Sequence, residues 1–294
     1  MRGLAVLFGA HVSAAGGISK AIDRIEAVGG DAVQVFTQSP RMWKPTVHAP
    51  EEIERFRARR EEAGIRAVLC HALYLVNLAS RDEEIRSKSL SSLRATMETA
   101  QAIRADAVVL HVGSHLGYGL DEALALVEPS LRELLELTTD DLWLCMENTA
   151  GAGGTIGRSL DELAAICDVL DGHPRLGVCI DSCHWWASGV DVSDPVALDE
   201  AVEALGSTIG LERVRCLHVN DAAVPLGSNR DRHELVGKGQ IGSGLATFLS
   251  HPAFDALPAV VETWEDKGPK TTDLRKLRRL RRAGLRERSV RRGS

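Results

Sequence analysis

The sequence lacks a hydrophobic run that could cross a membrane, since no stretch approaches the roughly 18 apolar residues of a transmembrane helix. Near the N-terminus, residues 1–17 resemble a signal peptide only weakly. Their apolar part covers about five residues, which is shorter than a typical h-region. We therefore expect a first buried strand there rather than a secretion signal, and no association with a membrane.

Cysteine is scarce, with six residues in a chain of 294. A chain of this length does not need disulfides for stability. Four cysteines lie in apolar, strand-like runs, namely Cys70, Cys145, Cys179 and Cys216. We expect them to be reduced core residues and the protein to be cytoplasmic.

An excess of positive charge is also missing, because the formal net charge is −6. This balance argues against a general nucleic-acid binder. The charge is uneven, however: residues 274–294 contain ten Lys or Arg and one acid, which leaves about −15 for the rest. This basic tail is either a solvated helix end or an electrostatic arm for nucleic acid, and the sequence leaves both readings open.

Eight short apolar runs recur along the chain, as expected for strands that are covered on both faces. They cover residues 5–12, 31–36, 66–72, 107–113, 142–148, 176–182, 214–221 and 259–264. Helix-like segments lie between them at 17–28, 51–63, 82–104, 121–138, 159–170, 194–209 and 243–250, and another starts near 270. The alternation predicts an α/β fold, a single-domain (β/α)₈ TIM barrel.

The main alternative fold is a doubly wound open sheet. No Gly-rich dinucleotide fingerprint follows the first strand, so this alternative has no support from a motif. We expect one catalytic barrel over residues 1–270, followed by a basic C-terminal helix or tail over residues 271–294.

Six consecutive strands end with, or are directly followed by, side chains that can bind metal ions. In a barrel, the carboxyl ends of the strands converge on one mouth, where active sites form. Four carboxylates gathered there would repel one another unless cations neutralise them, and few Lys or Arg stand at these strand ends. The candidate ligands are His71, His111, Glu147, Asp181, His184, His218, Asp231, His233 and Glu262.

Nine such side chains suit about three metal ions, because a catalytic zinc takes about three protein ligands. Imidazole and carboxylate favour zinc or manganese over magnesium. Three divalent ions would make the mouth cationic, which suits an anionic substrate such as a phosphodiester.

The chain resembles the endonuclease IV family of abasic-site (AP) endonucleases from about Phe8 to Trp264. The stretches that carry the resemblance are GAHVSAAGG (9–17), FTQSPRMW (36–43), HALYLVNLA (71–79), HVGSHLG (111–117), MENTAGAGG (146–154), CIDSCH (179–184), HVNDA (218–222), GSNRDRHELVGKGQIG (227–242) and VETW (261–264).

The resemblance implies a zinc-dependent DNA repair endonuclease with about three Zn²⁺ per chain, or Mn²⁺ at one site. Such an enzyme hydrolyses the phosphodiester 5′ to an abasic site in duplex DNA by attack of a metal-bridged hydroxide. It leaves a 3′-hydroxyl and a 5′-deoxyribose phosphate, and it also clears blocked 3′ ends. No obligate protein partner is expected, so the resemblance suits a monomer that is associated with the nucleoid through DNA.

By analogy, Glu147 is the catalytic residue that bridges two zinc ions. His71 and His111 complete the coordination of the first ion, and His184, Asp231 and His233 hold the third. The ligands that complete the coordination of the second ion are Asp181, His218 and Glu262. His11 and His115 also match family motifs, and we expect them to orient ligands or substrate.

Three residues match family positions that penetrate or fill the DNA at the lesion, namely Arg41, Tyr74 and Leu75. The sequence departs from the family at Gln38 and Ser39, where a basic or amide pair is common. Cys70 and Val112 stand where the family often has Pro. These departures put DNA contact and local loop shape in question, but not the ligands.

Two other functions are alternatives to a zinc phosphodiesterase. A metal-dependent sugar isomerase or epimerase on the same barrel would need fewer metal ions and would turn over a ketose. A non-catalytic lesion binder would hold abasic DNA without nicking it, and it would have no use for an open multi-metal site.

Overall fold

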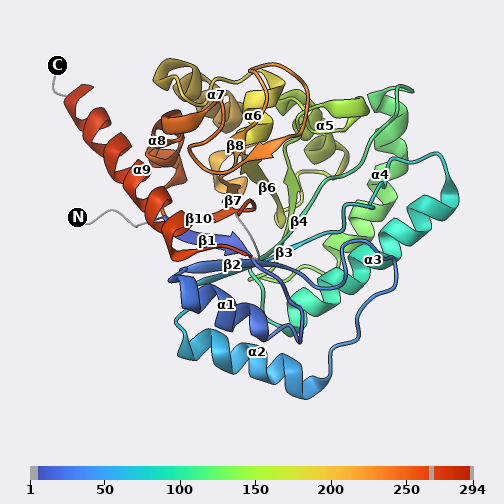
Figure 1. Cartoon of the computed structure of the whole chain (residues 1–294). Coiled ribbons are helices and arrows are strands. Elements are labelled where there is room, and N and C mark those ends of the chain that lie inside the picture. Colours follow the sequence, from blue (N-terminus) through green and yellow to red (C-terminus); the bar gives the residue numbers. More distant parts are fainter. Residues whose placement is uncertain (1–5, 265–267, 292–294) are drawn as a thin grey trace.

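A computed structural model describes residues 6–264 and 268–291 of the chain. Eight parallel strands close into a barrel in the order β1-β10-β7-β6-β5-β4-β3-β2 (Figure 1). They are β1 Leu7–His11, β2 Ala32–Phe36, β3 Ala67–His71, β4 Ala107–Leu110, β5 Trp143–Glu147, β6 Leu176–Asp181, β7 Val214–His218 and β10 Pro258–Val261. The TIM barrel prediction is confirmed, and closure excludes an open sheet because β1 pairs with both β2 and β10.

Helices surround the barrel and cover the outer face of its strands (Figure 1). Those the structure describes are α1 Lys20–Val28, α2 Pro50–Glu62, α3 Glu83–Ala102, α4 Leu120–Leu135, α5 Leu160–Val169, α6 Ser182–Ser188, α7 Pro195–Thr208, α8 Leu245–Leu249 and α9 Thr271–Arg291. Local sequence explains several starts: Ser159 caps α5, and Asp194 caps α7 with Pro195 in the first turn.

Three short elements at the mouth of the barrel are not among those expected from the sequence. Helix α6 begins directly after β6, so the CIDSCH stretch is a strand–helix junction. Strands β8 Asp221–Ala222 and β9 His233–Glu234 form a small antiparallel pair. Two-residue strands leave no periodic signal in a sequence, which is why the pair was not predicted.

The inside of the barrel is filled by small and branched side chains: Leu69, Ala107, Val109, Cys145, Cys179, Cys216 and Val260. Burial raises the pKa of the Cys145 and Cys179 thiols, which therefore stay protonated. All six cysteines are free and buried, as expected for a reduced core. In the described parts of the chain, no helix is long and apolar enough to span a membrane.

Candidate metal centre

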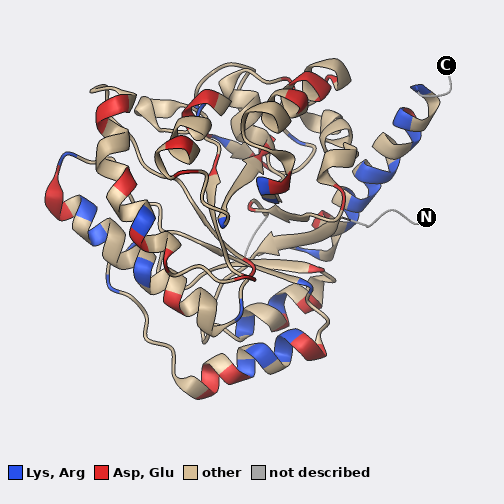
Figure 2. Ribbon diagram, turned by 180° about the vertical axis from the view of Figure 1, so that it is seen from behind, with Lys and Arg blue, Asp and Glu red and all other residues tan. Residues whose placement is uncertain are grey.

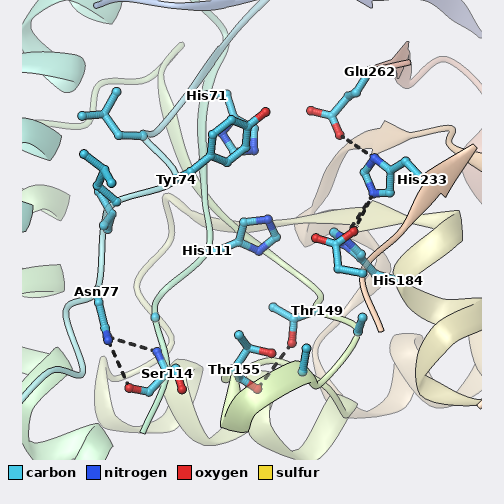
Figure 3. A pocket seen from close by; sticks show the side chains of 17 residues that line it. His71, Tyr74, Asn77, His111, Ser114, Thr149, Thr155, His184, His233 and Glu262 are labelled. Atoms are coloured by element: carbon cyan, nitrogen blue, oxygen red, sulfur yellow. Dashed lines mark hydrogen bonds and ion pairs between the residues drawn. The ribbon is translucent and has the colours of Figure 1, made fainter. Parts of the chain in front are cut away.

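The nine candidate ligands all lie at the carboxyl ends of the strands or in the loops that follow. Several of them line a cavity of about 530 Å³ together with Tyr74, Asn77 and Thr155 (Figure 3). The ligand candidates in its wall are His71, His111, His184, Asp231, His233 and Glu262. The others are buried beneath it, namely Glu147, Asp181 and His218.

Glu147 is the most central of these side chains, since four imidazoles approach its carboxylate from four different elements. Its Oε2 atom lies 3.3 Å from His71 Nε2 and 3.4 Å from His111 Nε2. Its Oε1 atom lies 2.9 Å from His218 Nδ1 and 3.2 Å from His184 Nδ1. A carboxylate with both oxygens directed at separate groups of nitrogens has the geometry of a bridging ligand.

The structure gathers the candidates into four overlapping groups whose ligand atoms lie within 4.8 Å of one another. One of them, His71, His218 and Glu262, links the first two of the three groups described next. The first contains His71, His111 and Glu147. The second contains Glu147, Asp181, His218 and Glu262. The third contains Asp181, His184 and His233.

Asp231 lies beside the third group. Its Oδ1 atom is 3.4 Å from His184 Nε2 and 3.3 Å from His233 Nε2. The two histidine Nε2 atoms are themselves only 3.3 Å apart (Figure 3). Two nitrogens and a carboxylate oxygen that face one another this closely are suited to share one cation.

For two of the histidines, His71 and His184, a backbone carbonyl fixes which ring nitrogen faces the centre. The Nδ1 of His71 donates to the carbonyl oxygen of Ala72 at 2.7 Å, which leaves Nε2 free to bind. The Nδ1 of His184 donates to the carbonyl oxygen of Asn148 at 2.9 Å. Ligating histidines in proteins are oriented in this way, by a hydrogen bond from the other ring nitrogen.

Three amide side chains that are not among the predicted site residues support the ligands. Gln34 contacts His218 Nε2 at 2.8 Å and donates to Glu262 at 2.8 Å. Asn220 donates to Asp181 at 2.6 Å and to Glu262 at 3.0 Å. Asn148 accepts from the backbone nitrogen of Asp181. The available signal was position, because Asn148 directly follows Glu147.

The charged forms of the acids and imidazoles stabilise one another. Burial acts to raise the pKa of Glu147, but the imidazoles of His218 and His111 outweigh it and hold this pKa well below its usual range. Burial acts to lower the pKa of His218, but Glu147 and Glu262 raise it well above 6.5. Similarly, His184 outweighs partial burial and keeps the pKa of Asp231 at about 2.

These residues fit divalent metal ions. Carboxylate oxygens and imidazole nitrogens converge, the described residues that line the cavity include no Lys or Arg, and His71 and His184 are each held by a hydrogen bond on the other ring nitrogen. This donor set suits zinc or manganese. The carboxylates can then be neutralised by cations bound among them rather than by protons alone.

The other predicted site residues lie around the rim. Tyr74 and Leu75 follow β3, line the cavity and are 69% and 39% exposed. Arg41 is exposed in the loop after β2 and does not line this cavity. His11 lies 3.8 Å from Glu262, whereas the Nδ1 of His115 accepts from the backbone of Gly117 and contacts none of the ligands.

Asp221 holds the loop that follows His233 and leads to α8. Its buried carboxylate accepts hydrogen bonds from four backbone nitrogens of the following loop, those of Gly237, Gly239, Ile241 and Gly242, at 2.8–3.2 Å. A side chain at Gly239 would clash with the carbonyl oxygen of Ala222. The close backbone approach therefore requires glycine at this position.

Replacing this carboxylate tests whether the loop positions the third group. In Asp221→Asn, an amide nitrogen would face backbone donors, so we expect a loss of about 2–3 kcal/mol of stability and a lower metal content per chain. Thermal melts and elemental analysis measure the two effects. The matched control is Asp121→Asn, an exposed position in the first turn of α4. Parent-like melting and metal content in Asp221→Asn would contradict this role.

Comparison with known proteins agrees with the architecture and the motifs. The sequence model of the xylose isomerase-like TIM barrel family matches residues 22–283. A probable endonuclease 4 of Chloroflexus aggregans is 37% identical over 277 residues, which is 93% of this chain and 97% of that protein. A probable endonuclease 4 of Natranaerobius thermophilus is 37% identical over 87% of this chain and 90% of its own length.

Comparison with solved structures also shows similarity to endonuclease IV. The crystal structure of endonuclease IV from Thermus thermophilus superimposes with a TM-score of 0.83 at 35% identity, over 96% of this chain and 99% of that one. A D-tagatose 3-epimerase-like protein reaches a TM-score of 0.69 at 20% identity, which reflects the shared fold alone. This chain therefore belongs to the endonuclease IV family of the xylose isomerase-like TIM barrels.

Proposed function

We propose that this protein is a zinc-dependent endonuclease that hydrolyses the phosphodiester 5′ to abasic sites in duplex DNA and also clears blocked 3′ ends. The observation that carries the proposal is the convergence of five imidazoles and four carboxylates on one barrel mouth, in a chain of the endonuclease IV family. The expected products are a 3′-hydroxyl and a 5′-deoxyribose phosphate.

About three ions would occupy the centre, all Zn²⁺ or with Mn²⁺ at one position. His71, His111 and Glu147 would hold one ion, and His184, Asp231 and His233 another. The residues that would hold the remaining ion together with Glu147 are Asp181, His218 and Glu262. When bound, such ions supply Lewis acidity that activates water and neutralises charge on the phosphodiester.

The protein's own side chains position the ligands and shield the centre from water. Gln34 and Asn220 orient the ligands, and the buried floor of the barrel keeps water from the underside of the centre. The chemistry needs no side-chain nucleophile: Cys183, between ligands in sequence, is buried with its thiol 3.7 Å from the Arg232 carbonyl oxygen. Burial also raises the pKa of this thiol, so it stays protonated.

Recognition of the lesion is assigned to the rim. An exposed aromatic and an exposed aliphatic side chain beside the cavity, Tyr74 and Leu75, are suited to fill the gap left by a missing base. Extrusion of the lesion costs least at a damaged nucleotide, which favours selective capture. Arg41 would contact the phosphate backbone from the neighbouring loop.

Shortening Leu75, one of the two side chains proposed to fill the gap, tests this assignment directly. We expect Leu75→Ala to lower kcat/KM on an abasic duplex by about 10-fold or more, because the filler of the gap is lost. The matched control is Leu211→Ala, since Leu211 is 40% exposed and precedes β7 at the opposite end of the barrel. Equal activity of the two variants in a steady-state nicking assay would remove Leu75 from recognition.

The decisive assay is incision of a labelled duplex that contains one synthetic abasic site, with the product ends identified by mass spectrometry. Nicking on the 5′ side of the site, with a 3′-hydroxyl, is the expected result. Binding to the abasic duplex without a nick would indicate a lesion binder. Turnover of a ketose with about one metal ion per chain would indicate a sugar isomerase or epimerase, and either result would overturn the proposal.

A further inference from the structure

The exposed face of α9 carries an uninterrupted stripe of arginines, which we call the arginine stripe. It consists of Arg275, Arg279, Arg282 and Arg286, and all four are exposed. Their spacing of four, three and four residues places them on one side of the helix. Within the described ranges, none of them makes an ion pair or a hydrogen bond through its side chain, so their donors are available.

The opposite side of α9 holds the helix firmly on the barrel. Leu274, Leu277 and Leu280 are buried, and a side chain at Gly284 would clash with the carbonyl oxygen of Ala246. Three other arginines pair with acids of the barrel: Arg278 with Asp31 at 3.0 Å, Arg281 with Asp255 at 2.5 Å and Arg288 with Asp199 at 3.2 Å. The stripe is therefore presented on a fixed scaffold.

The middle of α9 lies away from the metal centre, whereas its beginning reaches the loop after β9, where Lys276 lies against Gly237. Asp31 precedes β2 and Asp255 precedes β10, so the contacts of Arg278 and Arg281 place the middle of α9 at the amino end of the barrel. The candidate ligands all stand at the carboxyl end. Lys and Arg gather along α9 on the outer flank of the barrel, as Figure 2 shows.

We propose that the arginine stripe is a second, sequence-independent binding surface for the phosphate backbone of duplex DNA. The stripe is about 16 Å long, and duplex DNA presents about ten phosphate charges over that length. Arginine binds phosphate oxygens in a bidentate manner. The rest of the chain is strongly acidic, so this face is where an anionic surface meets the least repulsion.

The choice of DNA as the partner rests on the proposed function. An enzyme that must find rare lesions spends most of its time on undamaged duplex, and electrostatic contact to the backbone supplies that binding. Because the middle of α9 stands at the amino end of the barrel, the stripe would hold a different segment of DNA from the one being incised. Acidic protein and anionic lipid surfaces are the other occupants, and the experiment separates them.

The test uses a variant in which all four stripe arginines are replaced by Gln, whose helix propensity is similar. Its control carries Arg55→Gln, Arg66→Gln, Arg94→Gln and Arg104→Gln, which remove the same charge from another flank. A short duplex with a non-hydrolysable abasic analogue first saturates the mouth. Binding of a labelled undamaged duplex is then followed by fluorescence anisotropy over a range of KCl concentrations.

We expect the parent and the control to bind the undamaged duplex and the stripe variant to bind at least about 10²-fold more weakly near 50 mM KCl. The slope of log K against log salt should shrink by about 3.6, or 0.9 for each lost phosphate contact. A variant with lysine at all four stripe positions should keep most of the slope of log K against log salt. Incision of a short abasic duplex by the stripe variant should stay at the parental rate, which shows that the fold is intact.

Three outcomes would overturn the proposal: equal binding by the parent and the stripe variant, an equal loss in the control, or a loss confined to phosphatidylserine vesicles or an acidic peptide. The binding measurement does not depend on catalysis. If the parent fails to nick abasic DNA, the proposed function fails, while the anisotropy data still decide whether the stripe binds DNA.

Discussion

Glu147→Gln is expected to reduce the incision of abasic DNA by about 10³-fold or more while the protein stays folded. Glutamine has the same shape, but its amide offers one neutral oxygen where the carboxylate offers two charged ones. Four imidazoles surround this position at 2.9–3.4 Å, so no other side chain supplies an equivalent bridge. Loss of several kcal/mol of charge stabilisation at the reacting phosphate accounts for the size of the effect.

The measurement is a single-turnover incision assay with metal content determined on the same sample. We expect the metal content to fall below about three ions per chain, because two of the four groups use Glu147. The matched control is Glu128→Gln, the same chemical change on the outer surface at α4, where Glu128 pairs with Arg132. A rate for Glu147→Gln within a few-fold of the control would rule out Glu147 as the bridging ligand.

The barrel could be predicted from the sequence because its signal is repeated eight times. Each strand is a short apolar run with helix-like spacing on either side, and errors at one run do not affect the next. The observed ends differ by up to three residues; for example, β4 ends at Leu110 and β10 at Val261, one residue before the expected ligands and three before the ends of the apolar runs. Ends of elements depend on hydrogen bonds that a hydrophobic pattern does not encode.

The set of ligand types could be predicted for a related reason. Strand ends of a barrel meet at one mouth, so residues far apart in sequence can be grouped before their distances are known. Asp181 and His218, for example, are register partners on β6 and β7. Whether each predicted ligand binds metal, and whether Arg41, Tyr74 and Leu75 contact DNA, remain predictions for the experiments above.

The supporting groups could not be predicted, because their roles depend on exact backbone positions. Asp221 was an acid beside a strand end, like several others, and only its backbone donors reveal that it organises the loop before α8. Gln34 lies within β2, and its contact with His218 spans the barrel interior. Contacts of this kind join elements that are not adjacent in the sheet, and no local pattern marks them.

Removal of the metal ions is expected to abolish incision, by about 10³-fold or more, and to lower the melting temperature substantially. Each site that is saturated at 100 times its Kd stabilises the folded state by about 3 kcal/mol. A chain of this size loses about 2–4 °C in melting temperature for each kcal/mol. Chelation followed by dialysis, and then addition of Zn²⁺, should remove and restore both properties.

The stabilisation by metal should also depend on pH, with a sign that follows from the imidazoles. Without metal, burial acts to lower the pKa of His184 and His218, but neighbouring carboxylates raise both well above 6.5. A raised pKa stabilises the metal-free fold below pH 6.5, and that stabilisation disappears as the pH rises through the raised value. Metal binding requires neutral imidazole, so the metal-bound protein gains stability over the same range.

The difference in melting temperature between the metal-bound and metal-free proteins should therefore widen from about pH 6 to about pH 8. Calorimetric melts of both forms at matched ionic strength measure it, with chelator already saturated by Ca²⁺ as the control treatment. The difference in melting temperature increases for two reasons: the metal-free form loses stability as the pH rises, and the metal-bound form gains stability. If the difference stays constant with pH after elemental analysis has verified metal removal, the imidazoles do not hold the ions, and the cluster of candidate ligands fails as a metal site.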